Sequence, residues 1–326
     1  MDKKLLTLVL PVHNEQEVLP QTIRELRRIE VDLAEMALEY ELIFVNDGST
    51  DGSGHMLDVL ANEDSRICAL HLTRNFGHQA AISAGIAHSR GDVVAIMDAD
   101  LQDPPEALLQ LLAKWREGYQ VVFAIRKNRK EWFGKRFAYW FFYRIMRTIS
   151  EIEIPLDSGD FCVMDRSAVD LLSQLPEQQR FVRGLRSWIG LKQVGVTYER
   201  CARAAGTPSY NFRSLLKLAL DGFVSFSTVP LRMVTRIGLL GILFSLLMAG
   251  WVAGVTVFEW VYEIKRTPRG WTSLAFLVLW MGSIQILSLG VIGEYLSRIF
   301  LEVKNRPTYL IAKVVRIEKR LEIKHD

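Results

Sequence analysis

Residues 98–106 read DADLQDPPE and follow directly on an apolar run, so three carboxylates, Asp98, Asp100 and Asp103, occupy six positions. Like charges this close repel one another unless a cation lies among them. Side chains alternate in an extended segment, which predicts that Asp98 and Asp100 project to one side. Two hard oxygen ligands suit Mg²⁺ or Mn²⁺ and leave coordination positions for phosphate oxygens. The alternative is an acidic turn that caps the following helix, and this suits Asp103.

Two common phosphate-binding motifs are absent from the sequence. The glycines of DGSTDGSG at 47–54 do not fit the GxGxxG pattern of dinucleotide sites, and the chain has no GKS or GKT of a P-loop. The sequence therefore points to a diphosphate that is held through a metal ion, as in a nucleotide whose leaving group the ion stabilises.

The first 125 residues alternate β-rich runs with helical patterns, which predicts an α/β domain with a mainly parallel sheet. Strands are expected at 5–10, 41–46, 67–72, 93–97 and 120–125, and helices around 15–30, 52–62, 79–88 and 105–117. Ligands collect at the carboxyl ends of such strands. The segments expected there are PVHNE, NDGSTD, RNFGH and DADLQD. After DSGDF at 157–161, a helical region is expected to about residue 190.

The C-terminal third has the composition of a membrane hairpin. Residues 237–258 and 270–293 carry no charge over 22 and 24 positions, and each segment is long enough to cross a hydrocarbon layer of about 30 Å. More basic residues lie before the first apolar segment and after the second than in the connection between the two. This distribution predicts that both ends of the hairpin face the cytoplasm. Residues 211–226 show helical amphipathic spacing, which suits a helix in the membrane surface or one packed on the first domain.

These patterns predict four regions: a cytosolic domain at 1–210, an amphipathic region at 211–232, two transmembrane helices at 233–300 and a basic cytosolic tail at 301–326. The apolar run near the N-terminus is too short for a signal peptide. The three cysteines are far apart, which favours reduced thiols. A net charge of +3 gives no nucleic-acid signature.

Four motifs occur in a characteristic order: PVHNE at 11–15, VNDGSTDGS at 45–53, DADLQDPPE at 98–106 and DSGDF at 157–161. In this order and spacing they resemble glycosyltransferase family 2 with the GT-A fold. The appended hairpin is similar to that of the polyprenyl-phosphate glycosyltransferases, namely the bactoprenol glucosyltransferases and, more distantly, the dolichyl-phosphate mannose synthases.

The resemblance implies roles for the donor side of the site. Pro11, Asn14 and Glu15 would line the nucleoside pocket, Asp47 would hydrogen-bond the base, Asp98 and Asp100 would hold Mg²⁺ or Mn²⁺ under the diphosphate, and Gln102 would lie near the sugar or phosphate. The family pattern is often PxYNE and DDGS, whereas this chain has His13 and Asn46. His78 would border the donor, although a lone histidine is more often a surface residue.

An acceptor that is a lipid phosphate would give the later basic residues a role. Arg126, Lys135, Arg136 and Arg183 are the candidates for phosphate contact, with surface solubility as the alternative for each. Catalytic roles are assigned to Arg126, Asp157 and Asp160. The two carboxylates would orient the acceptor or take a residual proton, or one of them would simply pair with nearby basic residues.

The predicted reaction is inverting transfer of a hexose, with UDP-glucose as the favoured donor, to undecaprenyl or another polyprenyl phosphate at the bacterial cytoplasmic (inner) membrane. GDP-mannose is the alternative donor, and the resemblance also implies a homo-oligomer. A processive synthase is disfavoured because Arg186 stands one place too early for QxxRW. A nucleotide-sugar sensor without turnover is disfavoured because the Asp98/Asp100 pair and DSGDF are intact.

Overall fold

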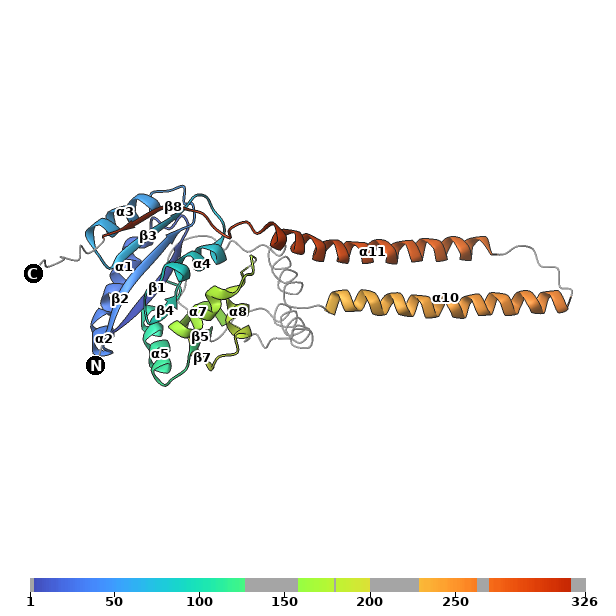
Figure 1. Cartoon of the computed structure of the whole chain (residues 1–326), viewed down its shortest axis with the longest axis horizontal. Helices are drawn as coiled ribbons and strands as arrows, with labels where there is room; N and C mark the ends of the chain where they lie inside the picture. The colour runs from blue at the N-terminus through green and yellow to red at the C-terminus, as the bar shows by residue number, and fades with distance from the viewer. Residues whose placement is uncertain (1–2, 127–157, 179, 200–228, 263–269, 318–326) are drawn as a thin grey trace, which may run out of the picture. The chain divides into compact units, whose positions relative to one another are not determined.

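The computed structural model describes residues 3–126, 158–178, 180–199, 229–262 and 270–317. The described residues up to 199 form one compact unit together with those from 305 onward, and residues 229–304 form a second. The first unit is built on an eight-stranded sheet (Figure 1). The second contains two long helices.

The sheet is mixed, with the strand order β7-β5-β6-β4-β1-β2-β3-β8. Its strands are β1 (Lys4–Val12), β2 (Leu38–Asn46), β3 (Ile67–Leu72), β4 (Val93–Ile96), β5 (Val121–Arg126), β6 (Ser158–Asp165), β7 (Gln193–Tyr198) and β8 (Ile311–Arg316). The pairs β1–β2, β1–β4, β2–β3 and β5–β7 are parallel, whereas β4–β6, β5–β6 and β3–β8 are antiparallel. The prediction of a mainly parallel sheet therefore holds for the first half of the domain only.

The five predicted strands and four predicted helical segments are all present. The helices are α1 (Leu19–Arg28), α2 (Glu30–Glu35), α3 (Ser53–Glu63), α4 (His78–His88) and α5 (Pro105–Arg116), followed by α7 (Arg166–Gln174) and α8 (Val182–Trp188). The expected helix at 15–30 is shorter and is followed by a separate α2. The helical region expected after DSGDF begins only at Arg166, because residues 158–165 form strand β6.

The two faces of the sheet are covered by different helices. Leu8 and Phe44 belong to the buried apolar cluster that includes residues of α1, α3 and α5. Val9 faces α4 instead, and a Cβ added at Gly85 would lie 2.2 Å from its Cγ1. Glycine at position 85 thus allows α4 to approach the sheet closely. This packing brings the N-terminus of α4 to the edge where the parallel strands end.

The last described strand corrects the prediction of a simple basic tail. Residues 311–316 form β8, which pairs antiparallel with β3 at the edge of the sheet (Figure 1). Arg316 Nη2 lies 2.6 Å from Glu41 Oε2, and Glu41 Oε1 accepts hydrogen bonds from Thr7 Oγ1 and the Arg90 amide. The basic residues Lys313 and Arg316 of IAKVVR thus belong to an edge strand, where charged side chains are common.

The second unit consists of α10 (Val229–Val261) and α11 (Trp271–Lys304), which run antiparallel side by side (Figure 1). Phe244 and Trp280 pack edge to face with ring centroids 5.6 Å apart. Among the described residues, one segment is long and apolar enough to cross a membrane, Leu277–Lys304, with a mean hydropathy of 1.6. Two transmembrane helices therefore stay a prediction, and the amphipathic region predicted at 211–232 lies mostly outside the described residues.

Replacing Arg316 with methionine is expected to destabilise the first unit by about 3 kcal/mol, because Glu41 would be left charged and largely buried without its cation. Chemical denaturation of the detergent-solubilised protein, followed through hydrogen exchange of the β3 amides, measures the change. Lys3→Met is the control, since Lys3 pairs with Glu39 at 3.6 Å in an exposed position and should contribute less than about 0.5 kcal/mol. Equal effects of the two changes would contradict the structural role of β8.

Candidate active site

The carboxyl ends of β1 and β2 are joined by hydrogen bonds between their two loops. The Asn14 amide donates to Ser49 Oγ at 3.0 Å, and Asn14 Oδ1 accepts from the Thr50 amide at 2.8 Å. The Glu15 amide donates to Ser53 Oγ at 3.0 Å. Asn14 has a positive φ of 57°, a conformation that asparagine tolerates better than most residues. Two of the predicted nucleoside-binding residues thus lie against the NDGSTD turn, and the third, Pro11, is buried in β1.

Asp47 connects this turn to the loop after β3. Its carboxylate is 3% exposed and accepts hydrogen bonds from the backbone amides of Phe76 and Gly77 at 2.7 and 2.9 Å. Gly77 has φ 96° and immediately precedes α4. The structure thus uses the Asp47 carboxylate to fix the entry to α4, and a contact with the base stays a prediction.

The DADLQD segment is a turn and does not continue the strand. β4 ends at Ile96, and Leu101 has φ 57°, so the argument from strand alternation for Asp98 and Asp100 was wrong. The Asp100 carboxylate accepts a hydrogen bond from the Gln102 amide at 3.1 Å. Asp103 is 1% exposed and accepts a hydrogen bond from the Tyr198 hydroxyl of β7. Asp103 therefore does not cap α5, whose N-cap residue is Pro104 without a side-chain bond.

Asp160 of β6 lies at the centre of a second set of charged contacts. Arg183 of α8 donates two hydrogen bonds to it, from Nε to Oδ1 at 3.2 Å and from Nη2 to Oδ2 at 3.1 Å. Gln79 Nε2 donates to Oδ2 at 3.0 Å, and Gln79 Oε1 accepts from the Val182 amide at 2.9 Å. The first turn of α4 and the start of α8 are thereby held together around a carboxylate whose side chain is 10% exposed.

His78 joins the two acidic groups. Its Nε2 lies 3.5 Å from Asp98 Oδ1 and 3.6 Å from Asp160 Oδ2. The segment predicted to bind the donor diphosphate and the segment predicted to meet the acceptor therefore adjoin across one imidazole ring. The His78 side chain is 44% exposed, as expected of a surface histidine. Its contacts with Asp98, in the turn after β4, and with Asp160 of β6 were not predictable, because the two aspartates are far apart in sequence.

The pKa values of the two carboxyls are shifted in opposite directions. Burial, followed by the charges of Asp103, Asp100 and Asp160, raises the pKa of Asp98 to about 6, although His78 opposes the shift. Burial also acts to raise the pKa of Asp160, but hydrogen bonds and charge from His78 and Arg183 outweigh it and hold that pKa well below its usual range. The pKa of His78 is raised, since its contacts with Asp160 and Asp98 outweigh the effect of burial.

Burial is the largest cause of the raised pKa of Asp98 and the neighbouring carboxylates add to it, so a divalent ion bound there would stabilise the charged form of Asp98. Among the described residues, no group of three or more potential ligands converges. A divalent ion held by Asp98 and Asp100, with its remaining oxygens from substrate and water, therefore stays a prediction.

The structure does not place every predicted residue. Asp157, Lys135 and Arg136 lie outside the described residues, and Arg126 is described only as the last position of β5, in register with Tyr198. Gln102 is half-buried beside Asp100. Gln79 and Tyr198 were missed by the sequence argument. Their spacing gives no signal, because each acts through a partner more than eighty residues away or on another strand.

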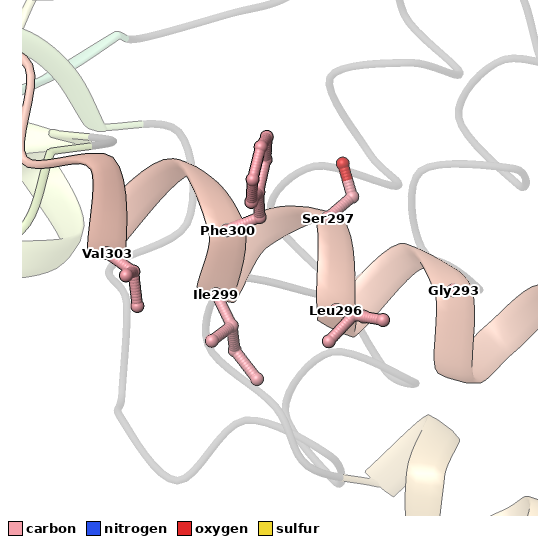
Figure 2. A pocket seen from close by; sticks show the side chains of 6 residues that line it. All are labelled: Gly293, Leu296, Ser297, Ile299, Phe300 and Val303. Atoms are coloured by element: carbon pink, nitrogen blue, oxygen red, sulfur yellow. The ribbon is translucent and has the colours of Figure 1, made fainter.

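A concave apolar surface lies on α11 in the second unit (Figure 2). It is lined by Gly293, Leu296, Ser297, Ile299, Phe300 and Val303. Ser297 is the only polar residue in this lining, so the surface carries no group for catalysis.

Comparison with known proteins agrees with the motifs. The family model "Glycosyl transferase family 2" matches residues 7–172, which make up half of the chain. The chain belongs to glycosyltransferase family 2. A Bacillus subtilis (strain 168) protein described as an uncharacterized glycosyltransferase is 41% identical, with 96% of this chain and 95% of that one covered. The SfII prophage-derived bactoprenol glucosyl transferase of Shigella flexneri is 39% identical, with 94% and 97% covered.

Solved structures of lower identity also match this glycosyltransferase. Glucosyl-3-phosphoglycerate synthase from Mycobacterium tuberculosis, solved with Mn²⁺, uridine diphosphate and glucosyl-3-phosphoglycerate, is 17% identical with a TM-score of 0.45, covering 68% of this chain and 77% of that one. A mannosyltransferase from Pyrobaculum calidifontis, solved with GDP-Man and Mn²⁺, is also 17% identical with a TM-score of 0.45, covering 63% and 58%.

Replacing Asp98 with asparagine is expected to stabilise the metal-free enzyme at neutral pH. The folded protein holds the Asp98 proton more tightly than the unfolded chain, so stability is lost as the pH rises from about 4 through about 6. The variant should gain about 1–2 kcal/mol above pH 7 and almost nothing below pH 4.

Urea unfolding of both proteins in chelator from pH 4 to 8 measures this difference. Asp170→Asn is the control, because Asp170 is exposed on α7 and pairs only with Arg166 at 3.8 Å. A stability difference for Asp98→Asn that does not change with pH would contradict the raised pKa.

Proposed function

We propose that this glycosyltransferase transfers a hexose from a nucleotide sugar, UDP-glucose being the first choice, to a polyprenyl monophosphate such as undecaprenyl phosphate. The observation that carries the proposal is the contact of His78 with both Asp98 and Asp160. It joins an acidic edge suited to a metal-bound diphosphate to Arg183, whose positive charge suits a second anion. Relatives described as bactoprenol glucosyl transferases support the lipid acceptor.

On the donor side, the loops after β1 and β2 would hold the nucleoside, with Asn14 and Glu15 positioned by the NDGSTD turn. Asp98 and Asp100 would hold a Mg²⁺ or Mn²⁺ ion, which when bound neutralises charge on the leaving diphosphate. Gln102 follows the same turn and would approach the sugar or phosphate. The residues of the chain at this edge of the sheet would orient the nucleotide sugar.

On the acceptor side, the nucleophile would be a phosphate oxygen. The second pKa of a phosphate monoester is about 6, so this oxygen is largely ionised at neutral pH and needs no strong base. Asp160 is a poor proton acceptor because its pKa is held well below the usual range. Its role would be to orient Arg183, whose charge offsets the approach of one anion to another. A single displacement would invert the configuration at the anomeric carbon.

The two apolar helices, α10 and α11, would hold the enzyme at the membrane where the lipid acceptor lies. A polyprenyl tail stays in the bilayer, so the active site must be held where the phosphate head reaches the surface. In this proposal α10 and α11 anchor the enzyme in the cytoplasmic membrane with the catalytic domain in the cytosol. The long exposed apolar faces of both helices support an anchor of this kind.

The proposal is tested by transfer of label into lipid. Purified enzyme would receive undecaprenyl phosphate, Mn²⁺ or Mg²⁺, and radiolabelled UDP-glucose or GDP-mannose, and the organic phase would be counted. Label from UDP-glucose is expected in the wild type and in Asp170→Asn, with a loss of at least about a hundredfold in Asp98→Asn. Label from GDP-mannose alone would make GDP-mannose the donor in place of UDP-glucose. Nucleotide binding without transfer from any nucleotide sugar would indicate a sensor.

Arg183→Lys is expected to lower the rate by about tenfold or more and to raise the KM for the lipid phosphate, because lysine cannot grip Asp160 with two parallel bonds. The KM for the nucleotide sugar should change by less than about twofold, since Arg183 lies on the acceptor side. Initial rates with each substrate varied in turn separate the two constants. A selective rise in the donor KM would assign Arg183 to the donor instead.

A further inference from the structure

Three polar side chains occupy register positions across adjacent strands of the sheet. Asn46 of β2 is paired with His71 of β3, and His71 is paired with Lys313 of β8. Side chains at paired positions stand on the same face of a sheet. Asp58 of α3 covers this face, with Oδ1 at 2.9 Å from His71 Nε2 and Oδ2 at 2.8 Å from Lys313 Nζ. These four residues are called here the cross-strand network.

The cross-strand network fixes the orientation of the Asn46 amide. Asn46 Nδ2 lies 3.0 Å from His71 Nδ1, and Asn46 Oδ1 accepts from the Ser49 amide at 2.9 Å. The 2.9 Å contact of His71 Nε2 with the Asp58 carboxylate favours a proton on Nε2, which leaves Nδ1 as the acceptor for Nδ2 of Asn46. A flipped amide would lose both bonds. An aspartate at position 46 would set an oxygen against that acceptor.

The packing around Asn46 leaves little freedom for another arrangement. Asn46 is 7% exposed, and a Cβ added at Gly54 of α3 would lie 3.0 Å from Asn46 Nδ2 and 3.8 Å from the His71 ring. Exposure rises along the network, from 13% for the His71 side chain to 26% for Asp58 and 57% for Lys313. A buried turn is thus connected through charged groups to a solvent-facing residue of the edge strand.

The buried end of the cross-strand network meets the proposed donor site. Ser49, whose amide is held by Asn46, accepts from the Asn14 amide through its hydroxyl. Asp47, next in sequence, fixes the loop that leads into His78 and Gln79. A shift of the Asn46 side chain would therefore move the nucleoside-binding turn.

We propose that His71, Asp58 and Lys313 are positioning residues for donor binding, which hold Asn46 and the 46–50 turn in the geometry that accepts the nucleoside. This inference rests on the proposed function for its ligand, a nucleoside diphosphate. It also explains why this chain has Asn46 where the family pattern often has aspartate. Because β8 supplies Lys313, the strand that follows the apolar helix α11 contributes to the donor site.

The test measures binding of UDP and of GDP to the full-length enzyme by titration calorimetry with Mn²⁺, without acceptor. His71→Phe keeps a ring and removes both nitrogens, and it is expected to raise the Kd of the nucleotide that binds by about tenfold. Asn46→Asp should also weaken binding, because the new carboxylate replaces the Nδ2 group that lies 3.0 Å from His71 Nδ1 and sets an oxygen there instead.

Two matched controls separate positioning from general stability. His55→Phe makes the same change at an exposed position of α3, and Lys3→Met matches Lys313→Met, for which a rise of about threefold is expected. Thermal unfolding of every variant records stability alongside the Kd.

A Kd within twofold of wild type in both His71→Phe and Asn46→Asp would overturn the inference, even if both variants are less stable. A wild type that binds neither nucleotide would overturn it too. A wild type that binds nucleotide but transfers no sugar to lipid would defeat the proposed acceptor, and the binding data would still decide the role of the network.

Discussion

Four carboxylates, Asp98, Asp100, Asp103 and Asp160, share one edge of the sheet, and the rest of the domain is arranged to satisfy them. Tyr198 of β7 donates to Asp103, a backbone amide donates to Asp100, and Arg183 of α8 holds Asp160. These partners come from elements that follow β5 or from the turn itself. Strand β7 and helix α8, which follow β5 in the chain, therefore supply two of the groups that stabilise so acidic an edge. The pKa of Asp98 is raised to about 6, mainly by burial, and a cation bound there would stabilise its charged form.

The first half of the fold was predictable because its strands are continuous apolar runs followed by turn residues. β3 has the predicted bounds, and β1, β2, β4 and β5 differ by a few residues at their ends. β6, β7 and β8 were missed for a common reason. Each contains polar or glycine residues and packs beside a strand that is distant in sequence, so its apolar pattern is weak. β8 in particular carries two basic residues and has several exposed positions, as an edge strand often does.

The site residues were found from the order of the motifs, but their contacts were not. Asp103 matched the helix-cap pattern, yet its carboxylate accepts a hydrogen bond from the hydroxyl of Tyr198, 95 positions away. His78 has no local signal, since the two aspartates beside it come from the turn after β4 and from β6. Asn46 stood out as a departure from the family pattern, and only the pairing of β2, β3 and β8 gives it a physical reason. Sequence spacing identifies residues that meet at strand ends, and tertiary pairing decides what each of them does.

Two carboxylates within 3.6 Å of one imidazole have pKa values shifted in opposite directions, and this limits the chemistry that each can perform. Asp160 stays ionised because Arg183 and His78 stabilise its charge, so it would not take up a proton near neutral pH. It also offsets much of the positive charge of Arg183, and the pair by itself attracts an anion weakly. An anionic acceptor would therefore depend on positive charge at Asp98 and Asp100 as well as on Arg183. In such a site the donor and its cation would have to be in place before the acceptor phosphate is held tightly, which couples donor binding to acceptor binding across His78.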